Sequence, residues 1–275
     1  MSRRVTLVKL GGSLITDKTR PGVLRGERLA GLARAVAAAR SEAGAVVLGH
    51  GSGSFGHVEA SRHGLDRPVE DTATWMGVAR TQDRAAVLHR SVVEALLAAG
   101  LPTFSWAPGS ALVAQAGRPA AGQAEPLVRA LEAGLLPVVH GDVVMDRVRG
   151  ACICSTETVF RFLVAELADA GWTVDRVLWM GETDGVWDAD GSRIPVLEPD
   201  SGPGARSSPG GAARGTDVTG GMRHRVETAL DLAREGVESW ILDGREPARL
   251  ADALRGEPRG GTRVPAKRTS GLGRA

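Results

Sequence analysis

Two glycine-rich stretches, each following an apolar run, carry the residues of this sequence that best suit anion chemistry. The first reads KLGGS at residues 9–13, and the second reads GHGSGSFGH at residues 49–57. Because glycine has no Cβ, backbone N–H groups in such turns can approach an anion closely and form a nest for it. Neither stretch is a G-x-x-x-x-G-K-[ST] loop or a G-x-G-x-x-G fingerprint. The sequence therefore predicts two anion-binding turns, called cradles below, that belong to neither of those two motif types.

Lysine is almost absent from the chain, and its placement supports the first cradle. Of 34 basic residues, only those at positions 9, 18 and 267 are lysines. Lys9 and Lys18 flank the first glycine turn. A lysine ammonium is a compact point charge with three donors, whereas a guanidinium is a broad planar fork. A lysine at the end of a strand is costly to bury without an anion, so Lys9 and Lys18 indicate phosphate binding.

The second cradle contains two histidines with different expected roles. His57 follows a Gly-Ser-Phe-Gly turn, where an imidazole can donate to a phosphate oxygen and titrate near neutrality. His50 is expected to be structural support. Two cradles at adjacent strand ends suit a donor phosphate and an acceptor phosphate.

The elements that must position these residues alternate between strands and helices. Apolar runs predict strands at 4–10, 43–48, 103–107, 136–140, 176–180 and 238–242, and helical spacing predicts helices at 26–39, 72–99, 126–133, 157–170 and 218–235. This alternation predicts a mainly parallel sheet covered on both faces. The active site is expected in the loops at the carboxyl ends of the strands, at residues 11–13, 49–57, 141–142 and 181–185, with 49–57 interpreted as an exit loop.

Bulk composition excludes several classes of protein. The 275 residues are 43% hydrophobic and carry a formal net charge of +2, which suits a globular α/β protein and gives no argument for nucleic-acid binding. No apolar run approaches a membrane span and no signal peptide is recognisable, so a cytoplasmic protein is expected. Cys152 and Cys154 have neither disulfide nor zinc spacing and are predicted to pack on a buried strand. The Gly-, Pro- and Ser-rich segment 198–217 is expected to be a flexible loop, with a mobile lid as the alternative.

Six motifs in order along the chain carry a family resemblance. They are KLGGSLITDK (9–18), GHGSGSFGH (49–57), HGDVV (140–144), GETDGV (181–186), DVTGGM (217–222) and GTRV (261–264). Together they resemble the amino acid kinase superfamily, and within it the branch of the isopentenyl phosphate kinases and the related fosfomycin-resistance kinases. The resemblance implies an α/β fold, a three-layer αβα sandwich with a central mainly parallel sheet. It also implies one domain over 1–275, with an acceptor half at about 1–170, an ATP half at about 171–265 and a flexible basic tail at 266–275.

The resemblance also implies ATP with Mg²⁺, a homodimer and a set of site residues, with no metal ligand assigned to the protein. The catalytic residues would be Lys9, Lys18, His57 and Glu157. The ATP-binding residues would be Gly11, Gly12, Ser13, Asp184, Gly185, Gly220, Gly221, Met222 and Arg225. The residues binding the acceptor would be Gly53, Ser54, Gly56, His57, Trp75, Met76 and Ala79. Phe104 and Trp106 are further candidates for the acceptor pocket, although half or more of its apolar residues are expected to be plain core.

Three departures from the family pattern bear on activity. Arg225 stands where the family usually has lysine, which keeps the charge and alters its reach. Ser155-Thr156-Glu157 stands in place of Ser-Gly-Asp, so Glu157 would hold the catalytic lysines with one extra methylene. Ser52 replaces a glycine of the usual His-Gly-Gly-Gly.

The resulting functional hypothesis is a kinase that converts isopentenyl phosphate to isopentenyl diphosphate. Apolar residues such as Met76 and Ala79 favour a prenyl monophosphate over a small phosphonate such as fosfomycin, which is the first alternative. The second alternative is a non-catalytic nucleotide-binding sensor, suggested by Arg225 and Glu157. The chain-length limit of the acceptor and the pathway served stay open.

Overall fold

A seven-stranded sheet forms the centre of the computed structural model, which describes residues 3–69, 71–188, 190–200 and 221–267. In order across the sheet, the strands are β13 (Thr262–Val264), β12 (Glu238–Asp243), β9 (Trp172–Gly181), β1 (Arg3–Leu10), β2 (Ala45–His50), β6 (Leu136–His140) and β3 (Thr103–Ser105). Every neighbouring pair is parallel except β12 and β13. The prediction of a mainly parallel sheet is confirmed.

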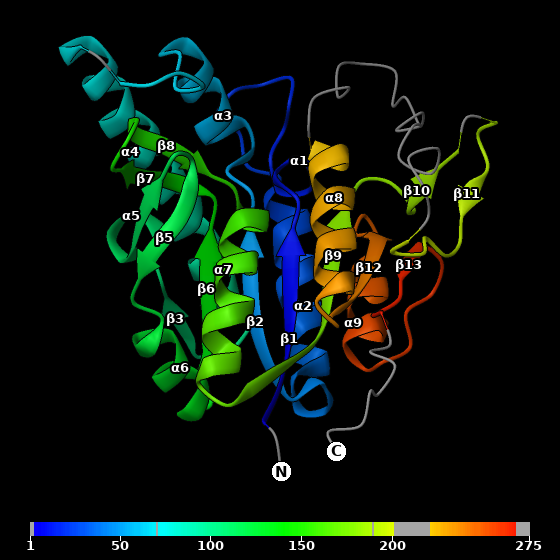
Figure 1. Cartoon of the computed structure of the whole chain (residues 1–275). Coiled ribbons are helices and arrows are strands. Elements are labelled where there is room, and N and C mark those ends of the chain that lie inside the picture. The colour runs from blue at the N-terminus through cyan, green and yellow to red at the C-terminus, as the bar shows by residue number, and fades with distance from the viewer. Residues whose placement is uncertain (1–2, 70, 189, 201–220, 268–275) are drawn as a thin grey trace.

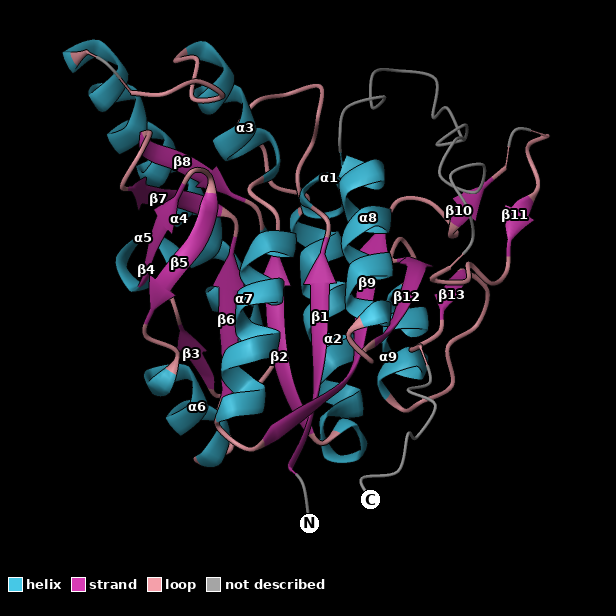
Figure 2. Cartoon of the chain, in the orientation of Figure 1, coloured by secondary structure: helices cyan, strands magenta, loops and turns pink. Residues whose placement is uncertain are grey.

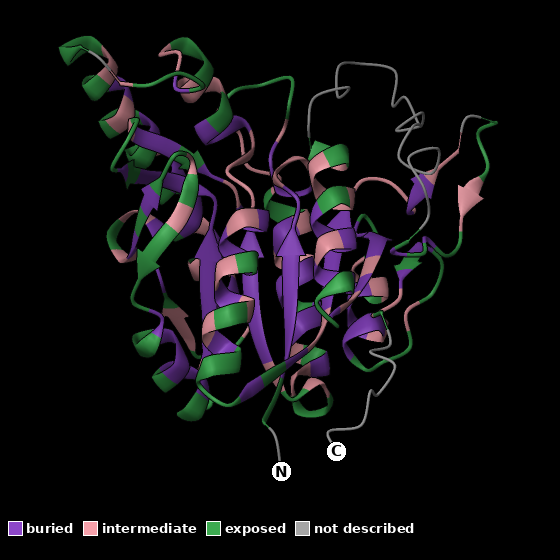
Figure 3. Ribbon diagram, viewed as in Figure 1, coloured by how far each residue is buried: buried purple, intermediate pink, exposed green. Residues whose placement is uncertain are grey.

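Helices cover both faces of this sheet and make a three-layer αβα sandwich (Figure 2). One face carries α2 (Gly26–Ala43), α4 (Thr72–Ala98) and α9 (Pro247–Leu254), and the other carries α6 (Glu125–Glu132), α7 (Thr156–Asp169) and α8 (Gly221–Arg234). Alternate strand residues enter the two cores: Leu7 packs with α7 and α8, whereas Val8 packs with α2 and α9. Figure 3 shows the result, a sheet buried on both sides beneath helices with exposed outer faces.

A second, four-stranded sheet was not anticipated from the sequence. It has the order β5 (Arg118–Gly122), β4 (Leu112–Gln115), β7 (Asp142–Asp146) and β8 (Gly150–Cys154), and it lies beside α3 (Gly53–Arg62) and the start of α4 in Figure 1. A short hairpin of β10 (Val186–Trp187) and β11 (Arg193–Ile194) extends from the other side. Cys152 and Cys154 are buried free thiols on β8, as predicted. Burial raises their pKa to about 11 and about 12, which makes them unreactive packing residues.

The stretch 49–57 is a loop only in its first half, which corrects the prediction of an exit loop. Helix α3 begins at Gly53, so His57 lies in a helix. Gly53 has a φ of +51°, and a Cβ there would lie 2.3 Å from Thr16 Oγ1. A left-handed conformation and the absence of a Cβ are both needed at this junction, so the sequence uses glycine to start the helix.

Two single-turn helices, α1 (Gly12–Ile15) and α5 (Pro108–Ala111), follow β1 and β3. Within the described residues, no helix is long and apolar enough to cross a membrane. Gly220, most of the segment 198–217 and residues 268–275 of the predicted tail lie outside the described residues.

Candidate active site

The carboxyl ends of the central strands meet at one edge of the sheet, the upper edge in Figure 1. Backbone hydrogen bonds join the turns that leave them: the Gly11 amide donates to Met180 at 2.8 Å, and the Gly51 amide donates to Leu10 at 3.0 Å. In open α/β sheets this edge is where ligands bind. The fold therefore brings the two predicted cradles to one place.

The two glycine turns pack backbone against backbone. A Cβ on Gly12 would lie 2.5 Å from the amide nitrogen of Gly53, and a Cβ on Gly51 would lie 2.9 Å from that of Gly12. Real Cβ atoms do not approach so closely, so neither position accepts a side chain without a shift of the backbone. The small residues allow the two turns to touch.

Thr16 links the two turns through its side chain, and sequence reasoning missed it. The fully buried hydroxyl donates to the Gly12 carbonyl at 2.8 Å and accepts from the Ser54 amide at 3.0 Å. The amides of Phe55 and Gly56 donate to the Ser52 carbonyl, each at 3.2 Å. The amides of residues 54–56 therefore have acceptors within the protein.

Lys9 and Glu157 form a buried ion pair beside the first turn. Lys9 is 6% exposed near the end of β1, and Glu157 is 4% exposed in the first turn of α7. Burial lowers the pKa of Lys9, and the carboxylate of Glu157 opposes that shift. Burial alone would raise the pKa of Glu157, but the charge and hydrogen bond of Lys9, with the charge of Arg225, bring it down to about 2. Glu157 is therefore ionised at neutral pH, and its carboxylate favours the ammonium form of Lys9.

Arg225 of α8 completes a charged cluster, defined here as Lys9, Glu157 and Arg225. A Cβ on Gly181 would lie 2.7 Å from Nη1 of Arg225, so the guanidinium occupies space that glycine leaves open. Its charge acts on both Lys9 and Glu157. Two cations and one carboxylate leave the cluster with an excess positive charge, which suits an anionic ligand.

His57 and Lys18 lie toward solvent. His57 Nδ1 is 3.1 Å from the Gly53 carbonyl and 3.1 Å from Ser52 Oγ. Because a carbonyl only accepts, the bond to Gly53 uses Nδ1–H and leaves Nε2 facing other partners. Lys18 is exposed in the turn after α1. The preceding Asp17 accepts hydrogen bonds from Thr19 and Arg20, which lower its pKa.

The candidates on the ATP side are spread over two features. The Asp184 carboxylate accepts from Arg249 at 2.8 Å, from Arg193 at 2.9 Å and from the Gly261 amide at 2.9 Å. It thereby ties the turn after β9, which includes Gly185, to the C-terminal segment. Gly221 and Met222 begin α8, and Met222 packs against the main core.

The acceptor candidates divide between surface and core. Trp75 is 39% and Met76 54% exposed on α4, and Ala79 is exposed on the same helix. Trp106 is buried in the main core and donates to the Gln123 carbonyl at 3.1 Å, with Phe104 packed against that core. Trp106 is therefore a core residue, in line with the expectation that many of these apolar residues pack internally.

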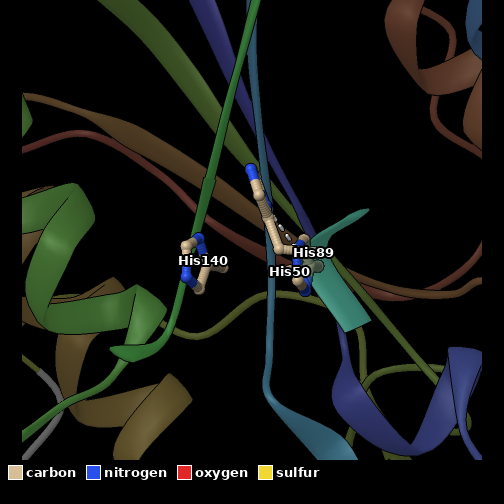
Figure 4. A group of neighbouring side chains, drawn as sticks. All are labelled: His50, His89 and His140. Carbon is tan, nitrogen blue, oxygen red and sulfur yellow. Dashed lines mark hydrogen bonds between the residues drawn. The ribbon is translucent and has the colours of Figure 1, made fainter. Parts of the chain in front are cut away.

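Three buried histidines form a second polar cluster that sequence reasoning did not find. The histidine cluster consists of His50 from β2, His89 from α4 and His140 from β6, and Figure 4 shows the three side chains together. One ring nitrogen from each histidine lies within 4.8 Å of the corresponding nitrogens of the other two. Imidazole nitrogens are common metal ligands in proteins. His50 was expected to be structural, but nothing in the sequence pairs it with His89 or His140, because the three lie on separate elements.

Comparison with known proteins identifies the family. The profile of the Amino acid kinase family matches residues 4–243. An isopentenyl phosphate kinase of Methanothermobacter thermautotrophicus is 32% identical over 273 residues, covering 95% of this chain and 99% of the relative. Another from Haloferax volcanii is 34% identical over 260 residues, covering 92% and 99% respectively. The chain belongs to the amino acid kinase family.

Solved structures agree with this assignment. A crystal structure of isopentenyl phosphate kinase superposes with a TM-score of 0.79 at 28% identity, covering 94% of this chain and all of that one. The product complex of the Thermoplasma acidophilum isopentenyl phosphate kinase, at 22% identity and a TM-score of 0.74, shares the fold. Within the amino acid kinase family, this chain is therefore similar over nearly its whole length to proteins named isopentenyl phosphate kinase.

Proposed function

We propose that this protein transfers the γ-phosphoryl group of ATP to isopentenyl phosphate and forms isopentenyl diphosphate. The observation that carries the proposal is the direct contact of two glycine turns, with the charged cluster beside one and His57 beside the other. A donor and an acceptor phosphate bound at touching turns would be close enough for direct transfer. The similarity to proteins named isopentenyl phosphate kinase supports the choice of acceptor.

The reaction needs positioning and charge stabilisation, with no covalent intermediate. Lys9 and Lys18 would offset the charge that develops on the transferred group, with Lys9 paired to Glu157. The Gly11 amide already donates to Met180, so the backbone amides of Gly12 and Ser13 would bind the β- and γ-phosphates, with Gly11 giving them room to approach. The excess positive charge of the cluster suits phosphate oxygens rather than a bare cation, so Mg²⁺ would arrive bound to the ATP phosphates.

The acceptor phosphate would be held chiefly by His57. Its Nδ1–H bonds to the Gly53 carbonyl, so the donor to a phosphate oxygen would be Nε2–H of the imidazolium form, in which both ring nitrogens carry a proton. The amides of Ser54 and Gly56 already have acceptors within the protein, which leaves the Gly53 amide as the backbone donor proposed for this cradle. The exposed Trp75, Met76 and Ala79 of α4 would contact the prenyl chain.

The proposed function also includes a division of the chain into two substrate-binding halves and an oligomeric state. Residues 1–170 would bind the acceptor and residues 171–265 would bind ATP, including Asp184, Gly185, Gly221, Met222 and Arg225. The active form would be a cytoplasmic homodimer. Light scattering of the purified chain at several concentrations tests the dimer.

One substrate panel tests the function. ADP release is followed with isopentenyl phosphate, dimethylallyl phosphate, fosfomycin and glutamate at saturating MgATP. We expect the highest kcat/KM with isopentenyl phosphate, and we expect Lys267→Met, at an exposed lysine paired with Asp200, to match the wild type. Exclusive activity on fosfomycin contradicts the proposed acceptor. ATP binding without turnover of any of the four contradicts a kinase of these substrates and favours a sensor.

A further inference from the structure

The histidine cluster lies directly beneath the second glycine turn. His50 is the last residue of β2 and precedes Gly51, which contacts Gly12 of the first turn. His50, His89 and His140 are 0%, 7% and 2% exposed. Only one peptide bond separates His50 from Gly51, so a shift of the His50 ring would displace Gly51 relative to Gly12.

The hydrogen bonds of the cluster indicate which ring nitrogen of His50 and of His89 carries the proton. His50 Nδ1 is 3.2 Å from the Gly51 carbonyl, which can only accept, so Nδ1 carries the proton. Burial, followed by the neighbouring His89 and His140, places the pKa of His50 well below its ordinary value, and burial with His140 lowers the pKa of His89 to about 3. Both rings are therefore neutral, with one proton each.

The remaining bonds follow from that first proton. Neutral His50 with a proton on Nδ1 must accept at Nε2, and His89 Nδ1 lies 3.0 Å from that atom, so His89 donates through Nδ1. His89 Nε2 then has no proton and accepts from Ser105 Oγ at 2.6 Å. Each group therefore donates to the next in a single direction: Ser105 donates to His89, His89 donates to His50, and His50 donates to the Gly51 carbonyl.

The ring arrangement suits this chain better than a metal site. The His50 and His89 centroids are 5.3 Å apart, the spacing expected of imidazoles that meet edge to edge through a hydrogen bond. His140 instead stacks on His89, with centroids 4.2 Å apart and ring planes inclined by 27°. A metal lies in the plane of each imidazole that binds it, roughly 2.0–2.1 Å from the nitrogen for zinc, so the stacked ring would have to turn before it could ligate.

We infer that Ser105, His89 and His50 form a directed hydrogen-bond chain that holds Gly51 against Gly12 and so aligns the acceptor cradle with the donor cradle. His50 and His89 are positioning residues in this arrangement, since neither reaches the substrates. His140 covers one face of His89, and its Nε2 lies 3.5 Å from Asp142 Oδ2. Asp142 is itself fixed by the amides of Gly109 at 2.9 Å and Val143 at 2.8 Å. The consequence for catalysis rests on the proposed function, whereas the proton positions do not.

The proton positions can be measured without any substrate. Long-range ¹H–¹⁵N correlation spectra of the ¹⁵N-labelled wild-type protein at neutral pH distinguish the two tautomers of each histidine, with resonances assigned from His50→Asn and His89→Asn. We expect the Nδ1–H tautomer for both His50 and His89. An Nε2–H tautomer or an imidazolium at either residue overturns the chain. Stoichiometric zinc in protein purified without a histidine tag also overturns it, because the metal would displace the bond between the two rings.

The positioning role is tested by kinetics. His89→Leu removes the donor to His50, whereas His89→Asn keeps a nitrogen donor close to the place of Nδ1. We expect His89→Leu to raise the KM for the acceptor about tenfold with a smaller change in kcat, the scale of one lost hydrogen bond that leaves a buried partner unsatisfied. His89→Asn should recover most of the loss. Ser105→Ala should have a weaker effect, and Ser91→Ala, at a half-buried serine of α4 whose hydroxyl donates to the Val87 carbonyl, should have none.

The hydrogen-bond chain and the proposed kinase function can each fail without the other. An unchanged acceptor KM in folded His89→Leu overturns the positioning role. If that variant does not fold, the wild-type tautomers decide whether the chain exists. If the wild type does not use the acceptor, the proposed function fails, and the spectra still test the chain.

Discussion

The charged cluster and the histidine cluster lie at the same edge of the sheet, and both contain buried ionisable side chains. They differ in whether these side chains carry a charge. In the first, Lys9 and Glu157 form an ion pair although each is less than a tenth exposed, and Lys9 brings the pKa of Glu157 down to about 2. In the second, the buried rings of His50 and His89 lose their charge instead. Burial alone therefore does not decide ionisation; an opposite charge in contact does. The ion pair lies beside the proposed site of the donor phosphate, and the neutral histidines lie beneath the proposed acceptor turn.

Replacing Lys9 should have the largest effect, because it removes the charge on which the comparison depends. Lys9→Met should lower kcat by about 10³-fold, the upper range for one lost group that stabilises transition-state charge. The measurement is steady-state ADP release at saturating isopentenyl phosphate, with Lys267→Met as the control. Lys9→Arg should also lose activity, since a guanidinium does not match a site shaped for an ammonium. Full activity of Lys9→Arg would show that lysine is not required there.

Glu157→Gln separates the ion pair from the lysine itself. It leaves Lys9 buried without its counter-charge, which should cost about 3–5 kcal/mol of unfolding free energy and about 10²-fold in kcat/KM. Glu94→Gln, at an exposed carboxylate paired with Arg90, should change stability by less than about 1 kcal/mol. Chemical denaturation measures both variants. Equal stabilities of the two variants would mean that the buried pair contributes no more than an exposed one.

The same pair predicts a dependence of stability on pH. The pKa of Glu157 falls from 4.5 to about 2 on folding, so its contribution is complete above pH 4.5 and is lost as the pH drops toward 2. The free energy of unfolding of the wild type should therefore fall more steeply over that interval than that of Glu157→Gln. Parallel curves over that interval contradict the assignment of this carboxylate.

His57→Ala tests the acceptor side, where the expected loss is smaller or comparable. Removing the imidazole should reduce kcat/KM for isopentenyl phosphate by about 10²-fold, the effect of one lost donor to a phosphate oxygen. The KM for ATP should change little, because His57 lies on α3, beside the proposed acceptor cradle. Arg62→Ala, at an exposed residue of the same helix, is the control. A near-normal rate with His57→Ala would make the histidine structural.

The sequence predicted the charged cluster better than the histidine cluster, for physical reasons. Lys9 and the glycine turns follow directly from a strand pattern and a local composition, and the central sheet follows from alternating apolar runs. His89 and His140 lie on α4 and β6, so only the fold brings them to His50. The start of α3 at Gly53 was missed because glycine and serine at its N-terminus resemble a loop. The four-stranded sheet was missed because strands such as β5, with the sequence RPAAG, have little intrinsic strand preference.

Thr16 joins the two glycine turns beside which the two clusters lie, and its replacement should have the smallest effect. Its fully buried hydroxyl forms a hydrogen-bonded link between Gly12 of the first turn and Ser54 of the second. Thr16→Val keeps the shape and removes both bonds, so kcat/KM should fall about tenfold, whereas Thr16→Ser keeps the hydroxyl and should stay within about threefold of the wild type. Steady-state kinetics with both substrates varied distinguishes alignment from general instability. A loss measured at a temperature where circular dichroism shows each variant folded reports the alignment of the turns and not the stability of the protein. If Thr16→Val matches Thr16→Ser, packing of the glycine turns is sufficient to align them and the hydroxyl is dispensable.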